Sequence, residues 1–168
     1  MTAPRSRRLL AITLGVAAIV VAIDQVTKAW AVASLRGSEP REILGTWLRL
    51  TYVENTGAAF SLGAGFTWIF TAIAVVVIVV IVRTASRLGS LGWAIALGGL
   101  LGGALGNLID RLTREPGIGR GYVVDFIAIP HWPVFNVADM SIVGSAILMV
   151  VLAFRGIDVD GTRAGRGA

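Results

Sequence analysis

Four long apolar runs dominate the sequence and restrict what the chain can fold into. They occupy residues 9–23, 55–82, 88–109 and 140–154, and none of them contains a charged residue. A helix of about 20 residues crosses a bilayer, and each run supplies one when its ends are trimmed or extended. The sequence therefore predicts an all-α polytopic membrane protein with four transmembrane helices, near residues 9–32, 66–83, 89–110 and 135–154.

The composition agrees with a membrane protein and excludes several kinds of chemistry. Only 15% of the 168 residues are charged, against about 25% in a soluble domain, and the mean hydropathy is +0.78. We expect one membrane domain over residues 1–168, with a disordered Gly- and Arg-rich tail at residues 156–168. The chain has no cysteine and one histidine. The lack of cysteine excludes thiolate chemistry, and the single histidine disfavours a histidine-based triad. We expect no metal and no cofactor.

The basic residues lie in short clusters beside the apolar runs. We attribute the formal charge of +5 to membrane topology and expect no nucleic-acid partner. Arg5, Arg7 and Arg8 precede the first span and only Arg36 follows it closely, which predicts that both termini are cytoplasmic. A cleaved signal peptide is the alternative, because residues 31–33 resemble a small-residue cleavage site. No soluble domain follows them in the sequence, so a retained span is favoured.

This orientation places two longer segments outside the membrane. The first, residues 34–65, contains a period-two alternation of apolar and polar side chains at residues 47–53. Such alternation predicts a small extracytoplasmic β-segment, a strand or hairpin that rests on the bilayer surface. The second, residues 111–134, is expected to be a loop. Trp47 and Trp132 should lie at the level of the lipid headgroups.

The first span carries two charged residues, Asp24 and Lys28. They are four residues apart and therefore share one helix face. Charged side chains inside a membrane are costly and usually mark a functional site. The alternative is a neutralising pair near the outer helix end, where Lys28 can extend its ammonium towards water.

The third span ends in a glycine-rich stretch followed by Asn107, Asp110 and Arg111. The glycines at residues 98–106 are expected to allow a neighbouring helix to approach closely, which is a structural role. The three polar side chains lie at i, i+3 and i+4, so one helix face presents an amide, a carboxylate and a guanidinium at the membrane boundary. A simple ion pair at the helix end is the alternative.

Two further aspartates, Asp125 and Asp139, provide the only credible pair of acid and base groups. Each has a structural explanation: Asn136 can cap a helix with Asp139 at its third position, and Asp125 can be a loop residue in water. Both lie at the outer membrane end among apolar residues. Adjacent carboxylates share a proton, so one can activate water while the other protonates a carbonyl oxygen. This pattern predicts metal-free peptide hydrolysis.

Five motifs, in this order along the chain, resemble the signature of the bacterial lipoprotein signal peptidase family, also called signal peptidase II. Together they extend from residue 24 to residue 139. They are DQVTK at Asp24–Lys28, NTGAAF at Asn55–Phe60, GGALGNLIDR at Gly102–Arg111, VVDF at Val123–Phe126 and FNVAD at Phe135–Asp139.

The resemblance implies an aspartic endopeptidase of the bacterial cytoplasmic (inner) membrane, with Asp125 and Asp139 as the catalytic pair at the extracytoplasmic face. The remaining matched positions would bind substrate and support that pair. One departure is visible, because the link at residues 112–124 is longer than is usual in the family, which leaves its path open. The supporting positions are Asp24, Lys28, Asn55, Gly57, Asn107, Arg111 and Asn136.

The resemblance also implies the substrate and the reaction. The partners would be prolipoproteins whose lipobox cysteine carries diacylglycerol, together with membrane lipids, and the enzyme would act as a monomer. Water held between Asp125 and Asp139 would attack the carbonyl on the N-terminal side of the lipidated cysteine. The sequence does not say which aspartate is the base.

Two other functions compete with this interpretation. In a Ser–Lys peptidase, Lys28 would be the base for Ser34 or Ser61, but the nearby Asp24 favours the charged ammonium. In a small transporter, Asp24, Lys28, Asp110 and Arg111 would line a polar pathway. Such a pathway should spread charges through the membrane depth, whereas here they gather near one boundary.

Overall fold

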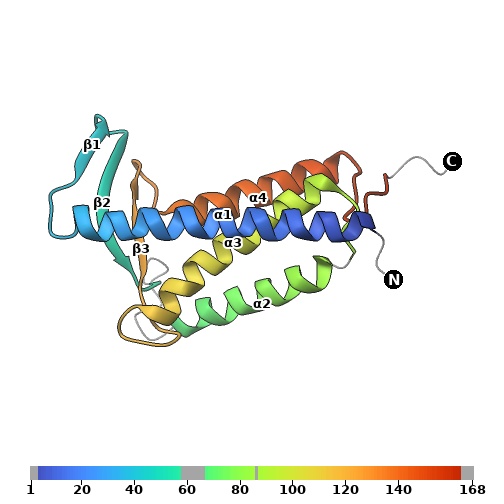
Figure 1. Cartoon of the computed structure of the whole chain (residues 1–168). Helices are drawn as coiled ribbons and strands as arrows, with labels where there is room; N and C mark the ends of the chain where they lie inside the picture. Colours follow the sequence, from blue (N-terminus) through green and yellow to red (C-terminus); the bar gives the residue numbers. More distant parts are fainter. Residues whose placement is uncertain (1–3, 58–66, 86, 164–168) are drawn as a thin grey trace.

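The computed structural model contains four long helices and one three-stranded sheet, and it describes residues 4–57, 67–85 and 87–163 (Figure 1). Within that part of the chain, four helices are long and apolar enough to cross a membrane, which confirms the predicted class. In chain order the elements are α1 (Pro4–Leu35), β1 (Arg41–Leu44), β2 (Leu48–Asn55), α2 (Thr67–Ala85), α3 (Leu91–Thr113), β3 (Val123–Ala128) and α4 (Val137–Phe154).

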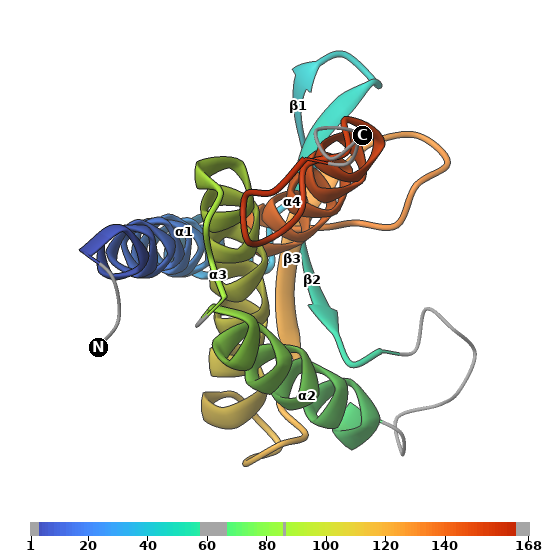
Figure 2. The same ribbon diagram turned by 90° about the vertical axis from the view of Figure 1, so that its right-hand side faces the viewer.

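The sheet lies at one end of the elongated bundle, and the start of α1 and the end of α4 lie at the other (Figure 1). Helix α3 runs between α1, α2 and α4 and packs against all three (Figure 2). Two of its glycines permit this packing. A Cβ added to Gly102 would lie 2.7 Å from the Cβ of Val20, and one on Gly103 would lie 2.6 Å from the carbonyl oxygen of Ala138. The predicted structural role of these glycines is confirmed.

The helices differ from the predicted spans mainly at their ends. Helix α1 extends beyond residues 9–32 in both directions, and α3 continues to Thr113. Helix α4 begins at Val137 because Asn136 caps it. Polar residues at a helix end can stay helical outside the hydrocarbon layer, so an apolar run underestimates the length of the helix.

The predicted β-segment forms the hairpin of β1 and β2, although residues 58–65 of the predicted segment lie outside the described part of the chain. The antiparallel strand order is β1-β2-β3. Strand β3 corrects the expected loop at residues 111–134. It is buried at nearly every position, with Val124 and Phe126 packed on α1, so it lacks the alternation that marks a half-exposed strand. Trp47 and Trp132 are 76% and 64% exposed at this end.

The segment after α4 also corrects an expectation. Residues 156–163 form turns with a defined path instead of the predicted disorder, while residues 164–168 lie outside the described chain. The indole Nε1 of Trp93 donates to the carbonyl oxygen of Ile157 at 2.8 Å, and the amide of Gly89 donates to that of Val159 at 2.9 Å. Backbone acceptors make these contacts, so side-chain composition does not reveal them.

The close approach of α1 and α3 leads to a test of packing. Gly102→Ala should lower the free energy of unfolding by about 1–3 kcal/mol, because the new methyl group has no space beside Val20. Gly15→Ala is the matched control: its added Cβ meets nothing within 4 Å, so stability should stay equal or rise by up to about 1 kcal/mol. Thermal unfolding in one detergent measures both. Equal effects of the two substitutions would contradict the packing argument.

Candidate active site

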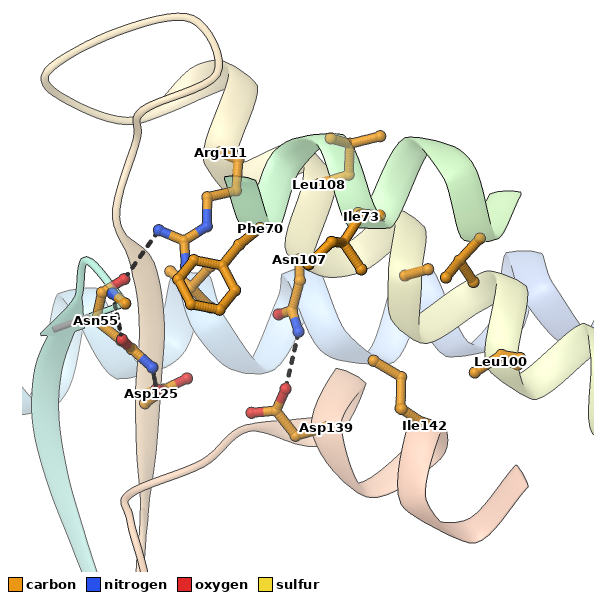
Figure 3. Close-up of a pocket in the computed structure, with 15 residues that line it drawn as sticks. Asn55, Phe70, Ile73, Leu100, Asn107, Leu108, Arg111, Asp125, Asp139 and Ile142 are labelled. Atoms are coloured by element: carbon orange, nitrogen blue, oxygen red, sulfur yellow. Dashed lines mark hydrogen bonds between the residues drawn. The ribbon is translucent and has the colours of Figure 1, made fainter. Parts of the chain in front are cut away.

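A cavity of about 330 Å³ lies where the sheet meets the helices, and both candidate catalytic aspartates line it (Figure 3). The structure thus brings Asp125 and Asp139 to one cavity, and their catalytic role stays a prediction. Polar groups from β2, β3, α3 and α4 surround the two carboxyls, while α2, α3 and α4 supply an apolar wall. The apolar lining includes Phe70, Ile73, Ala74, Val77, Leu100, Ala104, Leu108 and Ile142.

Asp125 lies on β3 and is only 1% exposed. Its Oδ1 accepts a 2.7 Å hydrogen bond from Nδ2 of Asn136, and its Oδ2 accepts one of 2.7 Å from Nδ2 of Asn55. Burial raises the pKa of the Asp125 carboxyl to about 7, and the negative charge of Asp139 adds to this rise. The two amide donors act in the opposite direction, because they stabilise the carboxylate. Asp125 is therefore poised to exchange a proton near neutral pH.

Asp139 is placed by the cap of α4. The side chain of Asn136 accepts a hydrogen bond from the Asp139 amide at 3.0 Å, and Asp139 Oδ2 accepts one from the Asn136 amide at 3.1 Å. This reciprocal capping box confirms the N-cap interpretation. Nδ2 of Asn107 donates to Asp139 Oδ1 at 2.8 Å, across the cavity from α3. The cap and the site thus use the same two residues.

A buried ammonium, that of Lys28, joins α1 to α3 beneath the two carboxyls. Its Nζ lies 2.8 Å from Asp24 Oδ2, 3.0 Å from Asp110 Oδ2 and 2.9 Å from Asn107 Oδ1. Lys28 is 0% exposed, so the idea that it reaches towards water is wrong, whereas pairing with Asp24 is confirmed. Removing one partner of a buried ion pair costs about 3–5 kcal/mol, because an uncompensated charge remains.

The two carboxylates that pair with Lys28 also hold the backbone next to the candidate catalytic residues. Asp24 Oδ1 accepts from the amide of Ala138 at 2.9 Å, one residue before Asp139. Asp110 Oδ2 accepts from the amide of Val124 at 3.1 Å, one residue before Asp125. Asp110 was absent from the sequence-derived site. Its place beside Asn107 and Arg111 was visible, but its backbone contact with β3 was not.

Arg111 and Gly57 support the site from outside the carboxyl network. Nη1 of Arg111 donates to the carbonyl oxygens of Asn55 at 3.2 Å and Gly121 at 2.9 Å, and its guanidinium lies 5.8 Å from the ring centre of Phe70. Gly57 has a positive φ of 90°, and a Cβ there would lie 2.5 Å from Phe70. Only glycine fits this position.

The long link after α3 folds back onto that helix. The amides of Gly119 and Gly121 donate to the carbonyl oxygen of Arg111 at 2.9 and 3.1 Å. The hydroxyl of Thr71 on α2 donates to the carbonyl oxygen of Gly119 at 2.7 Å. The extra length at residues 112–124 therefore closes the end of α3 and leaves Asp125 in place on β3.

The competing functions find less support in this geometry. The ammonium of Lys28 donates to three acceptors and so has no lone pair with which to activate Ser34, and Ser61 lies outside the described residues. The charges proposed for a transport pathway gather at the sheet end of the bundle, with Asp24 and Asp110 bound to one lysine. In the described part of the chain, no three His, Asp or Glu side chains are grouped to hold a metal ion.

Four helices long enough to span a membrane, with a cavity lined by a carboxyl from β3 and one from α4, fit a membrane hydrolase of the aspartic class. A family model described as signal peptidase (SPase) II matches residues 16–155. The chain therefore belongs to the signal peptidase II family, and it is a hydrolase that resides in a membrane.

Curated relatives and a solved structure agree with this family. The lipoprotein signal peptidase of Streptomyces coelicolor is 55% identical over 158 residues, which cover 94% of this chain and 78% of the relative. That of Mycobacterium avium is 52% identical over 161 residues, covering 95% and 88%. The structure of a bacterial membrane enzyme, determined by the in meso method at 1.9 Å resolution, matches with a TM-score of 0.75 and 31% identity over 85% of this chain and 92% of that chain.

The amide contacts of Asp125 predict how its pKa responds to substitution. Asn55→Ala removes a donor that stabilises the carboxylate, so the protonated form gains and the pKa of Asp125 should rise above about 7. One hydrogen bond to a charged group contributes about 1.5 kcal/mol, equivalent to a rise of about one pH unit. Titration of the ¹³Cγ signal of Asp125 in detergent measures this change in pKa.

Glu54→Gln is the control for this titration, because Glu54 lies on the same strand and its side chain bonds to Tyr52 instead. In this control the pKa of Asp125 should stay within about 0.3 of the wild-type value. A fall of the pKa in Asn55→Ala would show that Asn55 does not stabilise the charged form.

Proposed function

We propose that the protein cleaves the signal peptide from diacylglyceryl-modified prolipoproteins, on the N-terminal side of the lipidated cysteine, with Asp125 and Asp139 as its catalytic pair. The observation that carries this proposal is the shared cavity: both carboxyls line it, and its other wall is apolar. Hydrolysis needs an acid and a base that face one substrate bond. Relatives that bear the name lipoprotein signal peptidase support the choice of substrate.

The surroundings of the two carboxyls suggest which one acts as the acid and which one as the base. Asp125 is the more buried, and its pKa, raised to about 7, keeps a substantial fraction of the carboxyl protonated at neutral pH. Asp139 lies in the first turn of α4, where the helix dipole favours a negative charge. We therefore assign the proton of the resting pair to Asp125 and the role of base to Asp139.

The reaction then proceeds in two balanced steps. Asp139 takes a proton from water as the water oxygen bonds to the scissile carbonyl carbon, and Asp125 gives its proton to the carbonyl oxygen, which forms a gem-diol. In the second step Asp139 returns its proton to the leaving nitrogen while the C–N bond breaks. Asp125 regains a proton from the gem-diol as the new carboxyl group forms. The pair ends as it began.

The apolar wall of the cavity suits the signal peptide. Ile73 on α2, Leu100 on α3 and Ile142 on α4 line the same side of the cavity as Ala74 and Val77 of α2 do, and Figure 3 shows the first three. An apolar signal helix can lie along this wall within the membrane and place its scissile bond beside the carboxyls. The acyl chains of the cysteine stay in lipid, which holds the bond at the level of the site.

We also propose the orientation and state of the protein. It acts in the bacterial cytoplasmic membrane with cytoplasmic termini and an extracytoplasmic site. Support comes from Arg7 and Arg8 near the start of α1 and from the position of the sheet at the opposite end of the bundle (Figure 1). We further propose that it acts as a monomer, as the family resemblance implies.

The first prediction of this proposal concerns the two aspartates. Asp125→Asn and Asp139→Asn should each lower cleavage by at least about a thousandfold, because an amide keeps the shape of the carboxyl but cannot transfer its proton. Cleavage of a diacylglyceryl-modified prolipoprotein in detergent, read by mass spectrometry, measures this. Asp158→Asn, at the other end of the bundle, is the control and should retain wild-type activity. A near wild-type rate in either site variant would overturn the assignment.

The second prediction concerns the lipid on the substrate. The diacylated precursor should be cleaved at least about a hundredfold faster in kcat/KM than the same peptide with a bare cysteine, which corresponds to about 2.7 kcal/mol. Each buried methylene contributes about 0.8 kcal/mol of membrane affinity, so acyl chains hold the bond at the required depth. Both peptides are assayed in the same micelles at one pH. Comparable rates would indicate a general membrane peptidase.

A further inference from the structure

A second cavity lies at the end of the bundle opposite the sheet. It has a volume of about 380 Å³ and shares no lining residue with the active-site cavity. Two segments that are distant in the sequence form it: the last turns of α2 with Arg87 in the connection to α3, and the turn after α4. The lining residues are Val80, Arg83, Thr84, Arg87 and Val159.

The chemistry of this second cavity is cationic on one side and apolar on the other. Arg83 and Arg87 are both exposed, and both guanidinium groups line it. The carbonyl end of α2 carries partial negative charge, so an anion could bind here only through the arginines. Asp158 and Asp160 flank Val159 without lining the cavity, and Thr162 donates to both carboxylates, with its amide 2.9 Å from Asp160 Oδ1.

The exposed face of α2 leads from this cavity into the membrane. Val76, Val79 and Val82 are about half exposed, and Val80 both lines the cavity and faces outwards. A ligand with a phosphate at one end and acyl chains at the other matches this arrangement. We propose that the second cavity binds the headgroup of an anionic phospholipid, with its phosphate between Arg83 and Arg87 and its acyl chains along the valines of α2.

Such a lipid would affect the active site indirectly, through helix α2. Helix α2 supplies Phe70, Ile73, Ala74 and Val77 to the active-site wall and packs against α3. The lipid would connect the C-terminal end of α2 to the turn at Val159. The carbonyl oxygen of Val159 already accepts from the amide of Gly89. The C-terminal end of α2 already packs on the helix core through Ile81 and Ala85, and the lipid would add a contact on the exposed side of the same end.

The test measures bound lipid and is independent of peptidase activity. The full-length protein is placed in nanodiscs of phosphatidylcholine with a minor fraction of phosphatidylglycerol, and native mass spectrometry counts the phosphatidylglycerol retained after release. The variant R83Q/R87Q is compared with R8Q/R155Q. The control removes the same charge from exposed arginines at the same end of the bundle that do not line the cavity. Unchanged thermal unfolding in detergent confirms that both variants fold.

The expected result is a loss confined to the cavity variant. A guanidinium that donates directly to the phosphate contributes about tenfold, so R83Q/R87Q should retain the lipid about a hundredfold more weakly. R8Q/R155Q removes only diffuse surface attraction, which salt screens, so it should stay within about threefold of wild type at about 0.15 M salt. Equal losses in both would mean diffuse surface attraction and overturn the proposal. Displacement of the lipid by millimolar inorganic phosphate, with the same dependence on Arg83 and Arg87, would overturn the lipid assignment in favour of a free anion.

Discussion

The buried ion pairing of Lys28 is the interaction on which the geometry of the site depends. A membrane interior offers no water to an ammonium, so the chain must supply every acceptor, and Asp24, Asp110 and Asn107 do so within 3.0 Å. The second oxygen of Asp24 holds the start of α4, and Asp110 holds the start of β3. One charge therefore fixes two elements that otherwise share few contacts. The elements that carry the two catalytic candidates cannot shift separately without exposing a buried charge.

The residues that cap helix α4 also form part of the candidate site. Asn136 completes the capping box of α4 with its side-chain oxygen Oδ1, which accepts from the Asp139 amide. Its Nδ2 donates to Asp125 Oδ1 at 2.7 Å. The same amide places Asp139 at the third helical position. Because the first turn of a helix leaves amides without intrahelical partners, a cap is required there in any case. The structural and functional interpretations of Asn136 and Asp139 are thus compatible, and neither needs to exclude the other.

The sequence predicted those features that depend on local periodicity. Apolar runs identified four helices, the i,i+4 spacing identified the Asp24–Lys28 pair, and alternation identified the hairpin. Strand β3 escaped prediction because both of its faces are covered, so its pattern is that of any short apolar segment. The role of Asp110 and the path of the tail depend on bonds to backbone atoms of distant segments. Any residue type supplies such atoms, so the sequence carries no sign of them.

The cavity joins two kinds of wall at the sheet end of the helices, and the proposed function requires both. The carboxyl wall needs donors from strands and from a helix start, and these elements meet only where the chain leaves the hydrocarbon layer. The apolar wall needs spanning helices, since a signal helix must leave lipid without exposing its own backbone. Asp125 lies on a strand and Asp139 lies at the start of a helix, so the pair belongs to the carboxyl wall and borders the apolar wall. In the proposed function, a pair placed deeper among the helices would lack the reacting water, and a pair placed further out would lack the apolar surface for the signal peptide.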